Sequence, residues 1–305
     1  MSTRAVVIGF DFEDWHQIVR RRLGDDDWDR PSHSFREQLE AVLALLDGMG
    51  ARVTFFVLGM TAKHYPDLLV ALVERGHEIA CHGYAHVPVW TQTPEQFRDD
   101  LVRSLDLIEA LCGSRPIGYR APIFSIDRRA SWAWEIIAEA GLRYDASLHD
   151  TPRLHTRLAN IPSSPFILEL PSDRSLFEFP VTVGRLGGRP VPIGGGTYWR
   201  VLPLRLIVNG LRAHAATGGQ PTLYFHPYEF GAQKLRLGSA PRSLPRRAQA
   251  LYRSARVNFG RGRVATRIRT IATEFRLVSH RRACEELLEH GRLRSTPLPE
   301  EGRFL

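Results

Sequence analysis

The chain has 305 residues, of which 43% are hydrophobic and 24% charged, a balance that excludes wholesale disorder. The sequence holds no run of about 18 uncharged apolar residues, which argues against a transmembrane helix. Three widely spaced cysteines, Cys81, Cys112 and Cys284, exclude a disulfide framework and a C-x-x-C metal site. The apolar stretch at the N-terminus is too short for a signal peptide, so we expect a reducing, cytoplasmic location.

The net charge of +8 is unevenly distributed along the chain. Residues 234–282 hold 14 Lys and Arg against one acidic residue, Glu274, whereas residues 1–233 sum to −3. A segment this basic suits a phosphate, an acidic glycan or peripheral contact with an anionic membrane. A solvated Arg-rich face is the simpler alternative.

Short apolar strands alternate with helical stretches through the first 230 residues or so. We expect strands at 5–10, 52–58, 77–81, 117–120, 177–183 and 222–226, and helices at 35–49, 66–75, 94–111, 132–140 and 203–217. Residues 145–200 are rich in Pro, Gly and Ser and are interpreted as long loops, while 264–275 and 280–289 are expected to be helical.

This repeat indicates an α/β fold made of βα units around a parallel sheet. We divide the chain into a body of residues 1–233 and a mainly helical, Arg-rich C-terminal extension of residues 234–305 that packs on it. In such folds the functional residues lie at the carboxyl ends of the strands.

Three carboxylates follow the first predicted strand, in Asp11-Phe12-Glu13-Asp14. They repel one another, and a bound cation would relieve that repulsion. A solvated acidic loop is the alternative interpretation.

Two histidines, His82 and His86, follow the strand at 77–81. If this segment forms a helical turn, both rings lie on one face and can converge. Two histidines and one carboxylate form a zinc-type site that leaves room for water and substrate. We choose Asp14 as the carboxylate, which leaves Asp11 to act as a base.

Three more strand ends carry charged or titratable residues. His226 is a candidate proton donor to a leaving group. Arg120 could orient a catalytic carboxylate, and Asp145 could hold His226 and raise its pKa. Either residue could instead belong to an ordinary buried ion pair.

Taken in order, Asp11–Asp14, His82–His86, Arg120-Ala121-Pro122, Asp145-Ala146-Ser147 and Tyr224-Phe225-His226 resemble the five motifs of the polysaccharide deacetylase family, the carbohydrate esterases with a NodB homology domain. The segments DFEDWHQ, YRAPIFSI, GGGTYWRVLP and FHPYEF resemble a subgroup with a C-terminal extension, associated with exopolysaccharide and O-antigen gene clusters. The resemblance implies a distorted (β/α)7 barrel.

The resemblance also implies a chemistry for these residues. Asp14, His82 and His86 would hold a divalent metal, zinc foremost, with cobalt, nickel or iron accepted by similar sites. Asp11 would take a proton from the attacking water, Arg120 would steady this base, and His226, held by Asp145, would protonate the departing amine. Because Asp11 and Glu13 share a face of an ideal strand, Glu13-Asp14 could instead be the base and ligand pair.

The implied activity is removal of an N-acetyl group from an amino sugar of a cell-surface polysaccharide or its lipid-linked precursor. A deformylase would use the same machinery, and a catalytically silent glycan-binding module would have lost a ligand or the acid. A nucleic-acid binder is not expected, because residues 234–282 lack a zinc-finger spacing or RNA-binding aromatic signature.

Overall fold

The computed structural model describes residues 4–24, 29, 32, 34–149, 161–231, 233–235, 243–291 and 293–298. A single ten-stranded sheet organises the fold, and the core of this sheet is a series of parallel strands. These strands follow the order β10 (Thr222–Phe225), β1 (Ala5–Phe12), β2 (Thr54–Val57), β3 (Glu78–Cys81), β4 (Gly118–Tyr119), β5 (Tyr144–Asp145) and β7 (Ser175–Glu178). β1, at the middle of the molecule, is apolar on both faces because both are covered.

The two ends of this series approach each other without forming a strand pair. Thr182, just after β7, donates from its backbone N to Thr222 O at 3.0 Å, and Thr222 N donates to Thr182 Oγ1 at 2.7 Å. An isolated bridge joins Gly195 to Tyr224 of β10. The sheet therefore curls until the two ends of this series are in contact, without closing into a barrel through strand pairing in the described residues. A mostly parallel sheet of this kind agrees with the α/β fold that the resemblance implies.

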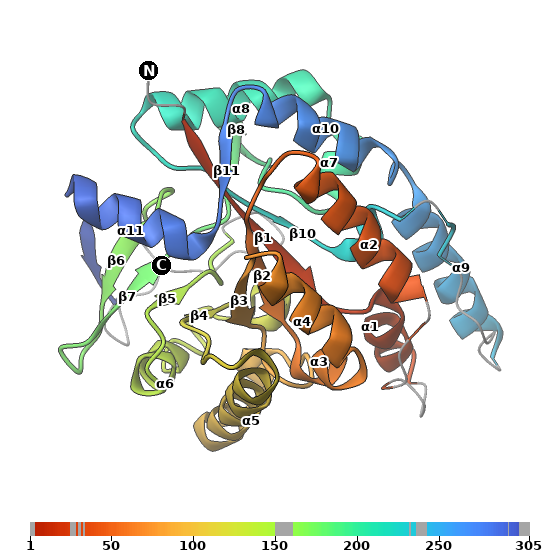
Figure 1. The fold of residues 1–305 in the computed structure, drawn as a ribbon, viewed down its shortest axis with the longest axis horizontal. Coiled ribbons are helices and arrows are strands. Elements are labelled where there is room, and N and C mark those ends of the chain that lie inside the picture. The colour runs from red at the N-terminus through yellow and green to blue at the C-terminus, as the bar shows by residue number, and fades with distance from the viewer. Residues whose placement is uncertain are drawn as a thin grey trace.

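Helices cover the outside of the curled sheet (Figure 1). They are α1 (Trp15–Arg22), α2 (Ser34–Asp47), α3 (Gly59–His64), α4 (Pro66–Glu74), α5 (Pro94–Cys112), α6 (Ala133–Glu139) and α8 (Leu204–Ala216), with short 3₁₀ turns η1 (Val89–Thr91), η2 (Pro122–Phe124) and η3 (Pro227–Glu229). α5 begins as its sequence predicts, because Thr93 and Gln96 form a reciprocal capping box, and it ends at Gly113 in the left-handed conformation.

The prediction of long loops at 145–200 is wrong for much of this stretch. Its described part contains β6 (Phe166–Glu169), which pairs antiparallel with β7, a hairpin of β8 (Val183–Leu186) and β9 (Arg189–Pro192), and the short helix α7 (Tyr198–Val201). The hairpin turn consists of Gly187 and Gly188, both with positive φ, the conformation that favours glycine in a two-residue turn. A high Gly and Pro content here marks tight turns between strands.

The C-terminal segment forms helices and also joins the central sheet. It contains α9 (Leu244–Asn258), α10 (Arg263–Ala272), β11 (Arg276–Val278), α11 (His280–His290) and β12 (Ser295–Pro297). β11 pairs parallel with β1, and β12 pairs with β6. The expected packing on the body is therefore a continuation of its sheet, and a domain boundary at residue 233 stays a prediction. Residues 236–242, 292 and 299–305 of this segment lie outside the described residues.

None of the helices in the described ranges combines the length and the apolar character needed to cross a bilayer.

Candidate active site

The carboxyl ends of the parallel strands bring the predicted motifs together. Glu13 follows β1, His82 follows β3, and His226 follows β10. All three side chains line one cavity of about 240 Å³. Its remaining lining residues are Asp11, Trp15, Ile18, Val19, His86, Ile123, Phe124, Thr197, Arg200, Tyr228, Arg253, Arg256 and Val257.

A carboxylate and two imidazoles form the densest polar group in this cavity. Glu13 Oε2 lies 2.9 Å from His86 Nε2 and 3.5 Å from His82 Nε2, and one ligand atom of each residue lies within 4.8 Å of the others. All three residues are buried. Burial acts to raise the pKa of Glu13, but the charge of His86 and the close contacts with both histidines outweigh it and hold this pKa well below its usual value.

The two histidines converge without the helical turn that the sequence analysis considered. Gly83 has φ 74° and His86 has φ 55°, so the chain turns sharply between the rings. Asp100 of α5 fixes this turn by accepting from the backbone N of Tyr84 at 2.8 Å and of Ala85 at 3.3 Å. A Cβ at position 83 would lie 2.9 Å from Asp100 Oδ2, which explains why this loop carries glycine.

The group of Glu13, His82 and His86 fits a divalent metal. Glu13 Oε2 and His82 Nε2 are buried and have no hydrogen-bond partner. Unpartnered buried polar atoms are costly, and a metal ion would satisfy both. The other nitrogen of His82, Nδ1, lies 2.7 Å from the backbone O of Arg120, a contact that orients the ring as metal-ligand histidines require. One carboxylate and two imidazoles are a zinc-type donor set.

The structure places Asp14 outside this group, so the prediction of Asp14 as the carboxylate ligand disagrees with the geometry. Asp14 is the N-cap of α1, and its Oδ1 accepts from His16 N at 2.9 Å. Its Oδ2 accepts from Ser32 N at 2.6 Å. β1 ends at Phe12 and α1 begins at Trp15, so the backbone changes direction between them. The side chains of Glu13 and Asp14 therefore point to different places. The alternation along β1, which puts Asp11 and Glu13 on one face, is the signal that points to Glu13.

Asp11 and Arg120 form the contact that we predicted. Arg120 Nη1 donates to Asp11 Oδ1 at 2.8 Å, and Arg120 Nε donates to Ala146 O at 3.1 Å. The guanidinium also lies over the ring of Phe56, 3.9 Å from its centroid. Gly9 makes room for this arrangement, because a Cβ there would lie 2.6 Å from Phe56 and 2.9 Å from Arg120 Nη1.

His226 faces the carboxylates of β1. Its Nε2 lies 3.5 Å from Glu13 Oε1 and 3.6 Å from Asp11 Oδ2. Its Nδ1 lies 3.6 Å from Oε2 of Glu229, a buried residue that sequence reasoning missed. Burial alone would lower the pKa of His226, but contact with Glu229 and the charges of Glu13, Glu229 and Asp11 raise it to about 9. A protonated imidazole is the form that a proton donor needs.

The prediction that Asp145 holds His226 is wrong. Asp145 accepts from Trp134 Nε1 at 2.8 Å and from Ser147 Oγ at 2.6 Å, and no ion pair joins it to His226. Burial raises the pKa of Asp145 despite these donors and contact with Glu178. The order of residues in His226-Pro227-Tyr228-Glu229 could have identified the true partner, because an acid three residues after a helix cap turns back toward it.

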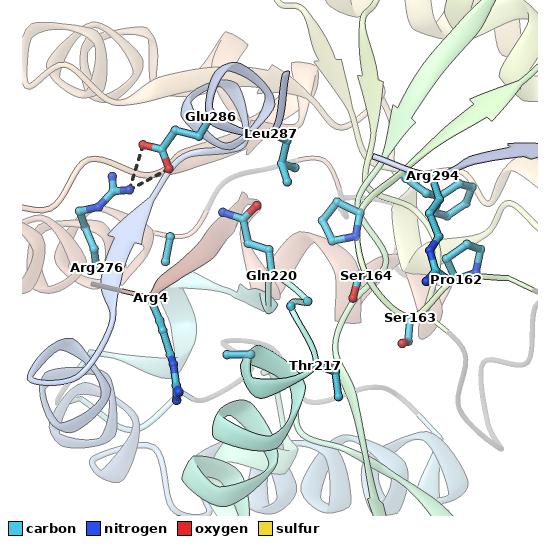
Figure 2. Close-up of a pocket in the computed structure, with 16 residues that line it drawn as sticks. Arg4, Pro162, Ser163, Ser164, Thr217, Gln220, Arg276, Glu286, Leu287 and Arg294 are labelled. Carbon is cyan, nitrogen blue, oxygen red and sulfur yellow. Dashed lines mark hydrogen bonds and ion pairs between the residues drawn. The ribbon is translucent and has the colours of Figure 1, made fainter. Parts of the chain in front are cut away.

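A second, larger cavity lies at the opposite end of β1 and contains none of these residues. It has a volume of about 810 Å³, and its walls include Arg4, Gln220 and Arg294. Figure 2 shows Arg276 on its rim, joined to Glu286 by two hydrogen bonds of 2.7 and 2.9 Å. We assign the chemistry to the smaller cavity, because that cavity holds the titratable groups and lies at the carboxyl ends of the strands.

Comparison with known proteins gives two family matches along the chain. Residues 25–144 match the family described as polysaccharide deacetylase, and residues 146–285 match a domain of unknown function, DUF3473. Residues 25–144 therefore form a polysaccharide deacetylase domain. His82, His86 and Arg120 lie within the first match, whereas Asp11 and Glu13 precede it.

Several curated relatives carry the deacetylase name, among them the following two. A peptidoglycan deacetylase-like protein, FGM2, of Gibberella zeae is 37% identical over 36% of this chain and 32% of its own length. A peptidoglycan deacetylase of Helicobacter pylori is 33% identical over 31% of this chain and 31% of its own. The match thus spans about a third of each relative.

The fold is shared over a much longer stretch with a solved structure. A Mycobacterium smegmatis protein assigned as a polysaccharide deacetylase superimposes with a TM-score of 0.67 at 23% identity, covering 99% of this chain and 95% of the other. This likeness supports the fold, including its C-terminal segment.

Proposed function

We propose that this protein is a metal-dependent hydrolase that removes an N-acetyl group from an amino sugar. The observation that carries the proposal is the convergence of Glu13, His82 and His86 beside Asp11 and His226 in one cavity. A silent glycan-binding module would not need a possible metal triad together with a base and a raised-pKa histidine.

Each residue of the site has a separate role in the proposed reaction. Glu13, His82 and His86 would hold the divalent metal, which when bound supplies a Lewis acid for the acyl carbonyl and lowers the pKa of its water. Asp11, fixed by Arg120, accepts a proton from the attacking water. His226, protonated and held by Glu229, donates a proton to the departing amine, so the products are acetate and a free amino sugar.

Glu13 serves as metal ligand in this proposal, so Asp11 is the base. Both carboxylates face His226, but only Glu13 contacts both histidines of the HGYAH loop. The metal is zinc, with cobalt, nickel or iron as substitutes that a mixed imidazole and carboxylate site accepts.

The substrate that we propose is a cell-surface polysaccharide of the O-antigen or exopolysaccharide type, or its lipid-linked precursor. The names of the relatives, which specify peptidoglycan, support a glycan amide as the target. A formyl group differs from acetyl only in size, so deformylation of a similar sugar is the second candidate.

We further propose that the protein works in the cytoplasm in peripheral contact with an anionic membrane. The three cysteines are free, as a reducing compartment would keep them. On α9, Leu244, Leu251 and Tyr252 are more than half exposed beside arginines, as in helices that lie on anionic bilayers. Vesicle sedimentation tests this contact: binding to anionic but not neutral vesicles is expected, and equal binding to both would contradict it.

An acyl-release assay tests the proposed reaction. The zinc-loaded protein is incubated with N-acetylated and N-formylated forms of one glycan panel, and acetate and formate are measured. Acetate release that is lost in Asp11→Asn and His226→Gln is expected. Faster formate release would favour the second candidate, and no release of either acid from any member of the panel would count against both.

A further inference from the structure

Three arginines line the same cavity as the proposed metal group. Arg200 comes from α7, and Arg253 and Arg256 come from α9 of the Arg-rich C-terminal segment. The reaction proposed above uses none of them. All three lie within residues 146–285, the part of the chain matched by a domain of unknown function.

Arg200 is buried and ties α9 to the catalytic machinery. It is 2% exposed, its Nη2 donates to Thr197 Oγ1 at 2.8 Å, and its Nη1 donates to the backbone O of Arg256 at 3.2 Å and of Val257. Its Nε lies 3.7 Å from Oε1 of Glu229, the residue that holds His226. The end of α9 is therefore held at a fixed position relative to the proton donor.

One face of α9 packs against α1, and this packing fixes the position of the helix that carries the arginines. Ala250 and Val257 pack in one apolar cluster with Trp15 and Val19 of α1, and Figure 1 shows the two helices side by side. Asn258 fixes the end of the helix by donating to Leu235 O and Ser254 O. A preorganised donor loses less entropy when it binds an anion.

Positive charge exceeds negative charge at this wall of the cavity. The sequence of α9 has four arginines and no acidic residue. Arg256 is exposed at the rim, and no carboxylate of the described residues forms an ion pair with it. The two carboxylates that line the cavity are already engaged, Asp11 by Arg120 and Glu13 in the proposed metal group with His82 and His86.

We propose that Arg253 and Arg256 form a subsite for an anionic group of the substrate, a carboxylate or a phosphate carried close to the acylated amine. Guanidinium groups recognise either anion through paired N–H donors. The inference rests on the proposed deacylation and deepens it, because the C-terminal segment would then select acidic glycans as substrates.

Calorimetry on the zinc-loaded full chain tests the subsite with matched probes. N-acetylmuramic acid and N-acetylglucosamine 1-phosphate supply the carboxylate and the phosphate, and methyl N-acetylglucosaminide supplies the neutral comparison. The double variant Arg253→Gln, Arg256→Gln is compared with Arg269→Gln, which removes an exposed arginine of α10 outside the cavity.

We expect the parent protein and Arg269→Gln to bind at least one charged probe about tenfold or more tighter than the neutral one, and the double variant to lose this preference. The charged probe that binds more tightly identifies the anionic group, carboxylate or phosphate, that the subsite prefers. A parent protein without preference, including one that binds no probe, or a preference that survives in the double variant, would overturn the subsite. Zinc content and unfolding temperature are measured on the same samples. Loss of zinc concerns the proposed function, and it is thereby distinguished from loss of the anion subsite in a protein that keeps its zinc.

Discussion

Arg120 Nη1 and Asp11 Oδ1 lie 2.8 Å apart, 109 residues distant in sequence, and their side chains are 0% and 4% exposed. Removing one partner of such a pair leaves a buried charge without compensation. We predict that Arg120→Met lowers the free energy of unfolding by about 3–5 kcal/mol, measured by chemical denaturation.

The matched control is Arg98→Met, which breaks the ion pair between Arg98 and Glu139, whose side chains are 49% and 37% exposed. An exposed pair contributes only about 0–1 kcal/mol. Equal losses in the two variants would show that Arg120 and Asp11 do not form a buried structural pair.

Gly9 allows Arg120 to reach Asp11. Because a Cβ at position 9 would lie 2.6 Å from the Phe56 ring and 2.9 Å from Arg120 Nη1, Gly9→Ala must displace one of them. We expect a loss of roughly 1–3 kcal/mol in unfolding free energy and a fall in deacylation rate. Gly262→Ala, with no atom within 4 Å and no positive φ, should be neutral or slightly stabilising. A neutral Gly9→Ala would contradict this packing.

Glu229 stabilises the protonated form of His226. In the metal-free protein, the pKa of His226 is raised to about 9, so the ring stays protonated until the pH approaches that value. Glu229→Gln removes one of the raising charges, and an NMR titration of the ring should show the pKa move down toward 6.5. Asp145→Asn is the control and should leave this titration unchanged. The reverse pattern would restore Asp145 as the partner.

His149 gives the folded protein a sensitivity to acid. Burial, with a smaller effect of Arg120, lowers its pKa from 6.5 to about 3, and it lies between the rings of Phe124 and Tyr224. The folded state therefore keeps the neutral ring while the unfolded chain takes up a proton below pH 6.5, so stability is lost as the pH falls from 6.5 toward 3.

Denaturation of the parent protein and His149→Phe at several pH values measures this effect. The stability of the parent should fall relative to the variant by up to about 1.4 kcal/mol per pH unit in that window. Parallel curves for the two proteins would show that His149 does not titrate differently in the folded state.

The fold was largely predictable because strong local signals agree with it. The capping box at Thr93, the helix stop at Gly113 and the apolar strand at β1 each appear where the sequence indicates. β11 and β12 were missed because short strands in an Arg-rich segment owe their conformation to pairing with β1 and β6, which no local pattern reveals.

In the candidate site, the structure brings together most of the residues that the sequence singled out, but two of the contacts expected between them differ. His82, His86, Asp11 and Arg120 lie where strand ends converge, which the alternation of strands and helices predicts. The choice between Glu13 and Asp14 depends on the residue at which β1 ends and α1 begins. A boundary shift of one residue reverses which side chain faces the cavity, and a single sequence does not fix boundaries that closely.

Metal content of two neighbouring variants tests the central claim most directly. Both proteins are purified, loaded with zinc, dialysed and analysed for bound metal, with circular dichroism to establish that they are folded. We predict that Glu13→Gln loses the metal, whereas Asp14→Asn, which keeps an acceptor at the N-cap of α1, binds it like the parent. Metal retained by Glu13→Gln and lost by Asp14→Asn would contradict the site described here.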